Sequence, residues 1–571
     1  MPGLFDRSAN LRRLAEADYD VLIIGGGITG AGVALDAASR GLRTALVERD
    51  DFASGTSSKS SKLVHGGLRY LQQGEIKLVY EALHERQRLR RNAPHLVKVL
   101  PFLIPIFAGK DGVVPKKLAR AMGSAMWTYD LTGGVRIGKV HKRIDIASVR
   151  AHMPTLRGDR LAPSYLYYDA QADDARLTLA IARTAVIEHG ATAVNGCSAV
   201  AVRKDDRGRA VGATVEADGK RFDVSARVLV NAAGVWSDDV RAMDEGADPE
   251  SIRPAKGVHV VIPWSRVRND IAVVIPVPKD RRSVFVVPWG DLTYVGTTDT
   301  DYDGPTEDPQ CTTEDIDYLL GALNFSMSSE VSRDDIVGTW AGLRPLVRDA
   351  SSDRTADLSR QHKVQRSASG VITITGGKLT TYRKMASDTV GEVIDTIGRD
   401  HLPGVNHRTR TKRLPIRGAE GYQALVDEAS TAAATLDRRT VVHLADRYGG
   451  EARAIIAMAD RNPSLAEPLV PSLPYIRAEA VFSARYEMAR SLDDILTRRT
   501  RARLLARDET AQVAAQVADL VSAELGWDSD ETARQVAGYE ALVLEERESA
   551  QLPDTHLVSI RETSAVPTAA P

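Results

Sequence analysis

Cysteine is almost absent from this sequence, since only Cys197 and Cys311 occur among its 571 residues. They form no CxxC pair, so neither a disulfide framework nor a zinc site is indicated, and we expect no metal site. A reducing, cytoplasmic setting fits best. Aromatic residues are sparse at 5%, whereas 43% hydrophobic and 26% charged residues are ordinary values for a folded globular protein.

The chain also lacks an excess of either charge. The 75 Lys and Arg residues against 76 Asp and Glu residues give a formal charge of −1, which excludes a nucleic-acid binder that works by bulk charge. No stretch approaches the roughly 18 continuous apolar residues of a membrane-spanning helix. The first residues, MPGLFDRSANLRRLAEAD, lack the apolar core and cleavage site of a signal peptide. If this protein meets a membrane, we expect it to lie on the surface.

The first strong pattern is residues 19–51, YDVLIIGGGITGAGVALDAASRGLRTALVERDD. It predicts a buried strand, a glycine turn, a helix of small residues and a second strand that ends in Glu48. Gly25 permits the sharp turn, Gly27 lets a pyrophosphate approach the backbone, and Gly30 lets helix and strand pack closely. Glu48 is placed to accept hydrogen bonds from ribose hydroxyls. The pattern predicts a dinucleotide site; the alternative is a glycine-rich turn that binds nothing.

Two later segments repeat this design of a strand that runs into a small-residue turn. They are RVLVNAAGVWSD at 227–238 and GVITITGGKLTTYRKMA at 370–386, where a glycine pair precedes a helix. Together with the first turn they predict one discontinuous nucleotide domain. The sequence has no second fingerprint for a separate nicotinamide nucleotide, so FAD is favoured over NAD. Ordinary strand-to-helix turns of an α/β protein are the alternative for either segment alone.

The motifs together resemble one family. GGGITGAG, TSSKSSKLVHGGLRYL, NAAGVWSD, GTTDTDYDG, WAGLRPL and TGGKLTTYRKMA occur in the order and spacing of the respiratory, FAD-dependent glycerol-3-phosphate dehydrogenases. The resemblance runs from about Tyr19 to about Ser549. Where the family's glycine fingerprint often has Asn, this chain has Thr29, and both small polar residues suit the start of a helix.

The resemblance implies an α/β fold with a Rossmann-like FAD-binding domain, an interleaved α+β substrate domain with an antiparallel sheet, and an all-α C-terminal domain. Short β-branched strands between about 253 and 300, and a composition rich in Ala, Arg, Glu and Leu after 413–422, agree with it. We expect an N-terminal extension (1–18), FAD-binding segments (19–90, 166–245 and 336–405), substrate-domain segments (91–165 and 246–335), helices (406–550) and a tail (551–571).

Residues 60–71, SSKLVHGGLRYL, supply groups that oxidation of a phosphorylated secondary alcohol requires. Such a reaction needs a base for the hydroxyl proton and cations for the dianion. Arg69 can grip phosphate with two hydrogen bonds and Tyr70 adds a donor. His65 alone in this stretch has an ordinary pKa near neutrality, which makes it the leading base; a structural histidine is the alternative. Lys62 is the least certain member, because its spacing fits solvent or an ion pair equally well.

Two distant cations complete the candidate site. Arg344 precedes Pro345, a position biased away from helix, and the resemblance implies that it points into the substrate site. Lys378 follows the glycine pair, and the resemblance implies that it lies near the flavin and the substrate, where it would hold the flavin electrostatically or bind phosphate. A surface or structural ion pair is the alternative for each.

Asp299 closes a predicted strand, where it would orient a substrate hydroxyl or a neighbouring cation; a plain strand-terminating turn is the alternative. The candidate catalytic residues are His65, Arg69, Arg344 and Lys378. The candidate substrate contacts are Arg69, Tyr70, Thr298, Asp299, Arg344 and Thr380. The candidate FAD contacts are Gly25, Gly27, Ile28, Thr29, Gly30, Glu48, Thr56, Ser57, Ser60, His65, Gly66, Gly67, Ala233, Gly234, Trp236, Gly377, Lys378, Leu379 and Thr380.

The resemblance implies oxidation of sn-glycerol 3-phosphate to dihydroxyacetone phosphate, with electrons passed to a membrane quinone. The basic segment 114–131, VPKKLARAMGSAMWTYDL, is the candidate lipid contact on the inner face of the cytoplasmic membrane; packing within the substrate domain is its alternative. The preceding run LVKVLPFLIPIF predicts a buried strand pair, and the charges of 478–506 predict a solvated helix face. An oxidase that forms peroxide and a non-catalytic flavin-binding module are the rival functions, and a homodimer stays open.

Overall fold

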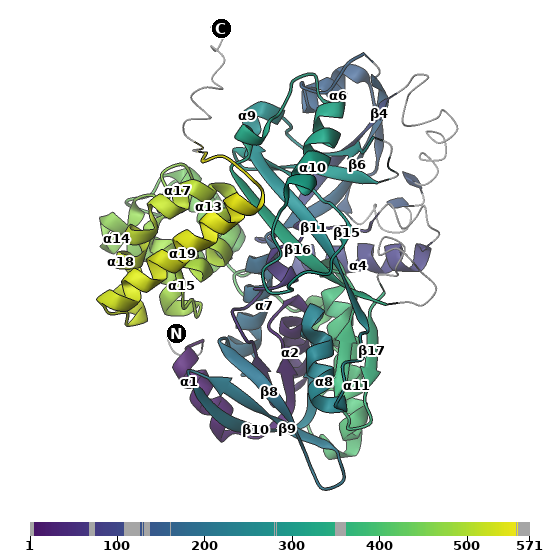
Figure 1. The fold of residues 1–571 in the computed structure, drawn as a ribbon, viewed down its shortest axis with the longest axis vertical. Coiled ribbons are helices and arrows are strands. Elements are labelled where there is room, and N and C mark those ends of the chain that lie inside the picture. The colour runs from purple at the N-terminus through teal and green to yellow at the C-terminus, as the bar shows by residue number, and fades with distance from the viewer. Residues whose placement is uncertain are drawn as a thin grey trace.

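The computed structural model describes residues 5–67, 75–107, 126–127, 129–130, 137–159, 161–278, 280, 282–348, 361–555 and 557. Two β-sheets lie end to end along the longest axis, and a bundle of helices formed by the C-terminal part of the chain lies at their side (Figure 1). The predicted mixed α/β fold with a helical C-terminal region is confirmed.

The first sheet contains the parallel strands of a nucleotide-binding domain. Strands β1, β2 and β7 are joined by parallel pairing, as are β1, β10 and β18. The sheet has eight strands in the order β17-β18-β10-β1-β2-β7, with β8 and β9 attached through β10. Their bounds are β1 (Tyr19–Ile24), β2 (Thr44–Val47), β7 (Thr192–Val194), β8 (Cys197–Lys204), β9 (Ala210–Ala217), β10 (Lys220–Asn231), β17 (Lys363–Arg366) and β18 (Ile372–Thr375).

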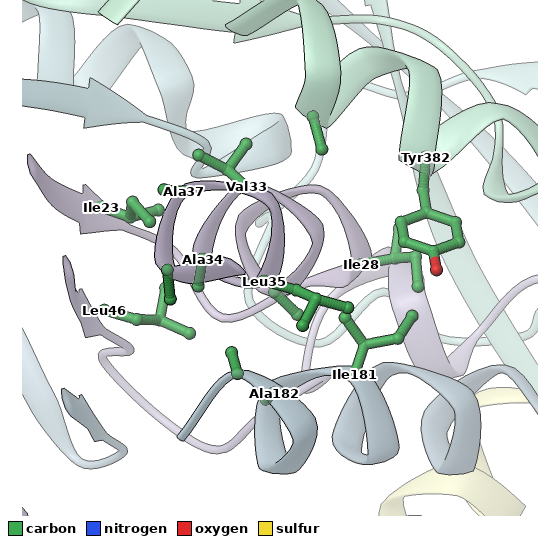
Figure 2. Close-up of a cluster of buried hydrophobic side chains, with 14 of the residues drawn as sticks. Ile23, Ile28, Val33, Ala34, Leu35, Ala37, Leu46, Ile181, Ala182 and Tyr382 are labelled. Carbon is green, nitrogen blue, oxygen red and sulfur yellow. The ribbon is translucent and has the colours of Figure 1, made fainter. Parts of the chain in front are cut away.

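One face of this sheet is covered by α2 (Ile28–Arg40), which lies between α7 (Asp174–Ile187) and α11 (Tyr382–Ile397). Figure 2 shows α2 with strand residues such as Ile23 on one side, Ile181 of α7 on another and Tyr382 of α11 on a third. The small residues of α2 allow these close contacts, because a Cβ on Gly32 would lie 2.7 Å from the Tyr382 ring. The buried helix thus fixes the carboxyl ends of β1, β2 and β10, where the candidate site lies.

The second sheet has ten strands in the order β15-β11-β14-β13-β12-β4-β6-β3, with β16 paired to β11 and β5 to β6. Its pairs are antiparallel apart from β4 with β12. Its bounds are β3 (Leu63–Val64), β4 (Val97–Phe107), β5 (Lys142–Ile144), β6 (Leu161–Ala172), β11 (Ile252–Pro263), β12 (Ala272–Pro276), β13 (Ser283–Trp289), β14 (Leu292–Gly296), β15 (Thr300–Asp301) and β16 (Gly338–Val347).

Strand β4 corrects one expectation, because residues 97–107 form a single strand rather than a strand pair. Pro101 stands opposite Tyr168 in the ladder, and the register shifts between Ile104 and Ile106, around Pro105. A proline that cannot donate to a ladder is tolerated at such an irregularity, so it bends the strand instead of ending it.

Two strands of the second sheet come from segments expected in the FAD-binding domain. Strand β3 pairs with β6, and β16 pairs with β11 over ten residue positions from Ile252–Val347 to Val261–Gly338. Strand β6 also crosses the expected boundary at 165/166. The chain therefore passes between the sheets within single segments, which brings 58–65 and 338–347 to the junction of the two sheets.

Of the remaining helices, those after residue 421 form the bundle. Before it stand α1 (Arg7–Glu16), α4 (Ile76–Asn92), α6 (Ile146–His152), α8 (Ser237–Glu245), α9 (Trp264–Val267) and α10 (Thr313–Ser326). The bundle contains α12 (Tyr422–Asp427), α13 (Arg438–Tyr448), α14 (Ala452–Arg461), α15 (Arg477–Tyr486), α16 (Ala502–Leu505), α17 (Arg507–Gln512), α18 (Ala514–Leu525) and α19 (Ser529–Ser549), with a π-helical turn at Asp494–Arg499. None of the helices among the described residues is long and apolar enough to cross a membrane.

The run 478–506 contradicts the expected solvated face. It is broken after α15, and most of its charged residues turn inward, although Arg485 and Arg490 are exposed. Glu479, Arg499 and Arg501 are at most 1% exposed. Arg499 binds Asp51 beside β2 with both terminal nitrogens, at 2.7 and 2.8 Å. The local sequence could not show these partners, which lie about 450 residues away. Most of the segment 114–131, the candidate lipid contact, lies outside the described residues.

Candidate functional site

A cleft of about 250 Å³ lies at the carboxyl ends of β1, β2 and β10. Residues from all three predicted turns line it, together with 54–57 and the start of β8. Of the candidate cofactor contacts, the cleft is lined by Gly25, Gly27, Ile28, Thr29, Glu48, Thr56, Ser57, Ser60, Ala233, Gly234, Trp236, Gly377, Lys378 and Leu379. Segments far apart in the sequence therefore form one cleft.

The start of α2 has the geometry of a pyrophosphate site. Gly25 has φ +110°, and a Cβ there would lie 2.7 Å from the Ala232 carbonyl oxygen, so only glycine fits. A Cβ on Gly30 would lie 1.8 Å from the Gly25 oxygen, which shows how closely helix and strand pack. Gly30 thus shapes the turn without lining the cleft. The helix begins at Gly27, whose lack of a side chain leaves the positive helix end open to an anion.

Glu48 stands at the end of β2 beside this turn. Its Oε2 accepts the Gly26 N–H at 2.6 Å and its Oε1 accepts the Asp50 N–H at 2.9 Å. Burial raises the pKa of this carboxyl to about 7, because the charged form loses hydration. A carboxylate fixed in this way can accept ribose hydroxyls at the rim of the cleft.

Trp236 gives a further sign that the cleft accepts a polar ligand. Its indole Nε1 is buried and has no acceptor among the described residues, while the Arg49 guanidinium lies 4.9 Å above its ring. A buried N–H without a partner is costly, so an acceptor on the cofactor would satisfy it. Together with the glycine turn and Glu48, these residues fit a dinucleotide.

Five candidate cofactor contacts do not line this cleft: Gly30, His65, Gly66, Gly67 and Thr380, of which His65 and Thr380 line the cavity next to it. Gly66 donates its N–H to the Tyr129 hydroxyl at 3.0 Å, and a Cβ there would lie 2.6 Å from that oxygen. Gly66 and Gly67 line neither this cleft nor the cavity next to it. Ser60 does line the cleft, but its hydroxyl binds the Asp174 carboxylate at 2.7 Å. The Gly66 N–H and the Ser60 hydroxyl therefore already have partners within the protein.

A second cavity of about 180 Å³ adjoins the cofactor cleft at the junction of the two sheets. Both are lined by Thr56, Ser60, Pro345, Gly376, Gly377, Lys378 and Leu379. The second cavity brings together His65, Arg344, Lys378 and Thr380, four predicted residues spread over more than 300 positions. We call it the substrate cavity from here on. Arg69 and Tyr70 lie outside the described residues.

Arg344 is held rigidly at the wall of the substrate cavity. Its guanidinium binds Asp299 at 3.0 Å, Thr297 Oγ1 at 3.2 Å and the Thr298 carbonyl oxygen at 3.3 Å. A carboxylate partner of this kind fixes the orientation of a cation. Of the roles considered for Asp299, orienting a neighbouring cation is the one in which the structure places it. Thr298 is 2% exposed and its hydroxyl accepts the Val258 N–H, so its side chain does not line the cavity.

His65 lines the same cavity, on the segment that follows β3. Its backbone N–H donates to the Thr380 hydroxyl at 3.1 Å, and that hydroxyl lies 3.3 Å from the His65 carbonyl oxygen. Its ring meets the edge of Phe285 at 6.2 Å. Thr380 therefore joins the turn after β18 to the wall that carries His65.

His259 on β11 was missed from the sequence. It lines the substrate cavity, it is 2% exposed, and its Nε2 lies 2.9 Å from Ser61 Oγ. Burial lowers its pKa well below the usual value, and the charges of Lys62 and Arg344 lower it further, so the imidazole is neutral. Its neighbours in GVHVVIP are apolar, and nothing in that pattern distinguishes an active histidine from a core residue. Lys59, which pairs with Asp308 at 2.9 Å, was also missed.

Comparison with known proteins identifies the family. Residues 20–383 match the family of FAD dependent oxidoreductases, and residues 409–532 match the C-terminal domain of alpha-glycerophosphate oxidase. The chain is 39% identical over 568 residues to glycerol-3-phosphate dehydrogenase 2 of Mycobacterium tuberculosis, which covers 99% of this chain and 94% of the relative. The chain belongs to the FAD-dependent glycerol-3-phosphate dehydrogenase family.

Further relatives extend this family relationship. Human mitochondrial glycerol-3-phosphate dehydrogenase is 38% identical over 561 residues, which are 94% of this chain and 75% of the relative. The X-ray structure of the glycerol-3-phosphate dehydrogenase from Bacillus halodurans, complexed with FAD, is 31% identical with a TM-score of 0.76 and covers 96% of this chain and 98% of its own. L-alpha-glycerophosphate oxidase from Mycoplasma pneumoniae, at 16% identity and a TM-score of 0.52, shares the fold.

FAD is the cofactor of this family member, and the cleft fits it. The α2 turn would hold the pyrophosphate, Glu48 the ribose and the shared wall at 376–379 the flavin. Among the described residues, no group of three or more His, Cys, Asp or Glu side chains could hold a metal ion. The chain is an FAD-dependent oxidoreductase.

Proposed function

We propose that this protein oxidises sn-glycerol 3-phosphate to dihydroxyacetone phosphate. The supporting observation is the substrate cavity, which places a rigidly held Arg344, Lys378 and a neutral imidazole against the wall that it shares with the cofactor cleft. The relatives from Mycobacterium tuberculosis and human mitochondria are named glycerol-3-phosphate dehydrogenases, which agrees with this substrate. When bound, FAD accepts the hydride that leaves C2 of the alcohol.

The cations bind the substrate phosphate. Arg344 offers donors with a fixed direction because Asp299 and Thr297 hold it, and guanidinium groups match the geometry of phosphate oxygens. Lys378 and Lys59 line the same cavity. Their charges favour a dianion over an uncharged polyol, which predicts that glycerol itself is a poor substrate.

His259 accepts the hydroxyl proton. Its neutral ring has a lone pair available, and the hydroxyl of Ser61, 2.9 Å from Nε2, fixes the orientation of the imidazole. A bound phosphate dianion raises the histidine pKa again towards the working range, because a nearby negative charge favours the imidazolium. His65, the candidate from the sequence, lines the same cavity and is the second candidate base.

The decisive experiment is anaerobic mixing of the purified flavoprotein with glycerol 3-phosphate. We expect rapid bleaching of the flavin absorbance, and no bleaching with glycerol, lactate or amino acids. His259→Gln should slow bleaching by at least about 10²-fold, as expected for loss of a general base, while His65→Gln isolates the second candidate. A protein whose flavin stays oxidised would contradict the proposal and support a non-catalytic binding module.

The electrons pass, in this proposal, to a membrane quinone, with the protein lying on the inner face of the cytoplasmic membrane. The support is the family relationship and the basic, Met- and Trp-containing sequence of 114–131. We expect the reduced enzyme to reduce a soluble quinone analogue and to sediment with anionic vesicles. Absence of both would argue against a membrane acceptor.

An oxidase that gives peroxide is the second candidate, because the family model matched by 409–532 is named after alpha-glycerophosphate oxidase. The two functions differ in the acceptor and share the first half-reaction. Stoichiometric peroxide without quinone-analogue reduction would favour the oxidase.

A further inference from the structure

Lys62 lies buried directly behind the wall of the substrate cavity. It is 1% exposed and adopts φ +56°, which few residues other than glycine accept. Its ammonium binds the Ser58 carbonyl oxygen at 3.0 Å and Asp174 at 3.2 Å. An ion pair, one of the two roles left open by the sequence, is therefore its environment, and a buried lysine at such a backbone position calls for an explanation.

The explanation lies in a stack of three layers. The Lys62 ammonium lies 4.4 Å from the centre of the Trp340 ring. The other side of the stack is His259, whose ring lies 4.6 Å from that of Trp340 at an interplanar angle of 11°. A cation above an aromatic face is attracted by its π-electrons, and the effect grows when the cation is removed from water. Lys62 and His259 are thus joined through one indole.

The same segment is braced from the helical bundle. Arg501 donates to the Ser58 carbonyl oxygen at 2.6 Å and to Asp174 at 3.0 Å. Asp174 also accepts the Ser60 N–H and hydroxyl at 2.9 and 2.7 Å. The Ser60 carbonyl oxygen accepts the indole N–H of Trp340 at 3.1 Å. Residues 58–62 and Trp340 therefore have one fixed arrangement, set by a buried carboxylate and two buried cations.

We propose that Lys62 is a positioning residue for the reaction. It supports the Trp340 ring, and through that ring it keeps His259 uncharged and oriented to accept the substrate proton. This inference rests on the proposed function, because it assigns a task to the base. It also connects the helical bundle to the site, since Arg501 binds the carboxylate to which Lys62 is bound.

The charges around the stack support a role for the ammonium itself. The groups that face His259 are Lys62 through the indole, Arg344, and the Tyr294 ring at 6.0 Å, with Lys59, His65 and Lys378 along the cavity. The groups that face Lys62 are Arg501, Asp173 and Asp174. Burial and Arg501 lower the pKa of Lys62 to about 8, so it is a cation at neutral pH. The positive charge of Lys62 then disfavours protonation of the His259 imidazole.

The test compares Lys62→Met with wild-type holoenzyme in anaerobic stopped-flow reduction by glycerol 3-phosphate. We expect the rate constant to fall by about tenfold or more. The acidic limb of its pH profile should move to higher pH by on the order of one unit, the effect of one charge two ring layers away at an effective dielectric constant of about 20. The direction follows because loss of the cation lets His259 protonate more readily.

Lys256→Met is the matched control. Lys256 lies on β11, the strand that carries His259, and is also buried, at 7% exposed. Its ammonium pairs with Asp315 at 2.6 Å. The Lys256→Met variant loses a buried ion pair but leaves Lys62, Trp340 and His259 unchanged. The acidic limb of its pH profile should therefore stay at the wild-type pH. Lys62→Arg keeps the charge and should keep the wild-type limb even where its rate falls. If Lys62→Met does not fold, Trp340→Phe, which weakens the middle layer, is expected to shift the limb in the same direction.

A Lys62→Met enzyme with a slower rate but an unmoved acidic limb would overturn the proposal, because a merely structural lysine gives that result. Titration of the His259 ring by ¹⁵N-histidine NMR provides a readout without turnover, with the resonance assigned by its loss in His259→Gln. Unchanged titration in Lys62→Met refutes the positioning role. Wild-type flavin that glycerol 3-phosphate does not bleach refutes the proposed function instead, and the NMR comparison still decides the role of Lys62.

Discussion

The Gly27→Val substitution separates cofactor binding from folding. Gly27 is the N-cap of α2, and a Cβ there would have Ser57 Oγ, which accepts the Ile28 N–H at 2.8 Å, as its nearest atom at 3.1 Å. The two γ-methyl groups of valine then extend over the helix end that receives the pyrophosphate. Each charge-assisted hydrogen bond to a phosphate contributes about 1.5–3 kcal/mol, so loss of two costs about 3–6 kcal/mol. The dissociation constant of FAD should rise roughly 10²–10⁴-fold.

The assay measures the FAD content after purification and the dissociation constant by flavin fluorescence on adding FAD to apoprotein. Circular dichroism melting of the apoproteins checks that the variant is folded. Gly321→Val is the matched control, because a Cβ on Gly321 in α10 meets no atom within 4 Å, and it should bind FAD as the wild type does. A Gly27→Val protein that binds FAD within about threefold of wild type would refute the assignment of the pyrophosphate to this turn.

Three further predictions concern carboxylates. Asp299→Asn should raise KM for glycerol 3-phosphate by about tenfold or more with an unchanged flavin spectrum, because Arg344 loses its charged partner; steady-state kinetics checks this. Glu48 has its pKa raised to about 7 in the protein without ligand, so FAD affinity should increase as pH rises through about 7 and Glu48 ionises, and Glu48→Gln should remove that dependence in fluorescence titrations. Asp51→Asn should lower the free energy of unfolding by about 3–5 kcal/mol, since Arg499 would be left buried without the carboxylate that binds both of its terminal nitrogens; urea unfolding measures it.

The residues of the cofactor cleft could be predicted from the sequence because the backbone turn that forms it depends on residues close together in the chain. A turn that needs φ +110° and a Cβ-free approach can be made only by glycine, so Gly25 is visible in the sequence itself. Strand, turn, helix and acid follow each other within about 30 residues. The cleft contains these residues in the predicted arrangement.

Only some of the residues that line the substrate cavity could be predicted from the sequence. Arg344 and Lys378 stand out as cations beside a proline and a glycine pair, and both line the substrate cavity. His259 occupies one position in an apolar strand whose alternate residues, Val258 and Val260, are fully buried. A histidine in that place has the same local pattern whether it fills a core or lines a site.

The sequence by itself determined the dinucleotide fold, the FAD cofactor and the family, because glycines, small helices and strand-end acids act on their immediate neighbours. Only the tertiary structure decided the environment of the charges. Arg499 and Arg501 look like surface residues in a charged run, yet they are buried against Asp51 and Asp174 from the first half of the chain. Lys62 likewise gains its role from an indole nearly 280 residues away. Electrostatic and stacking interactions depend on distance in space, and that distance is fixed only when the two sheets and the helical bundle meet.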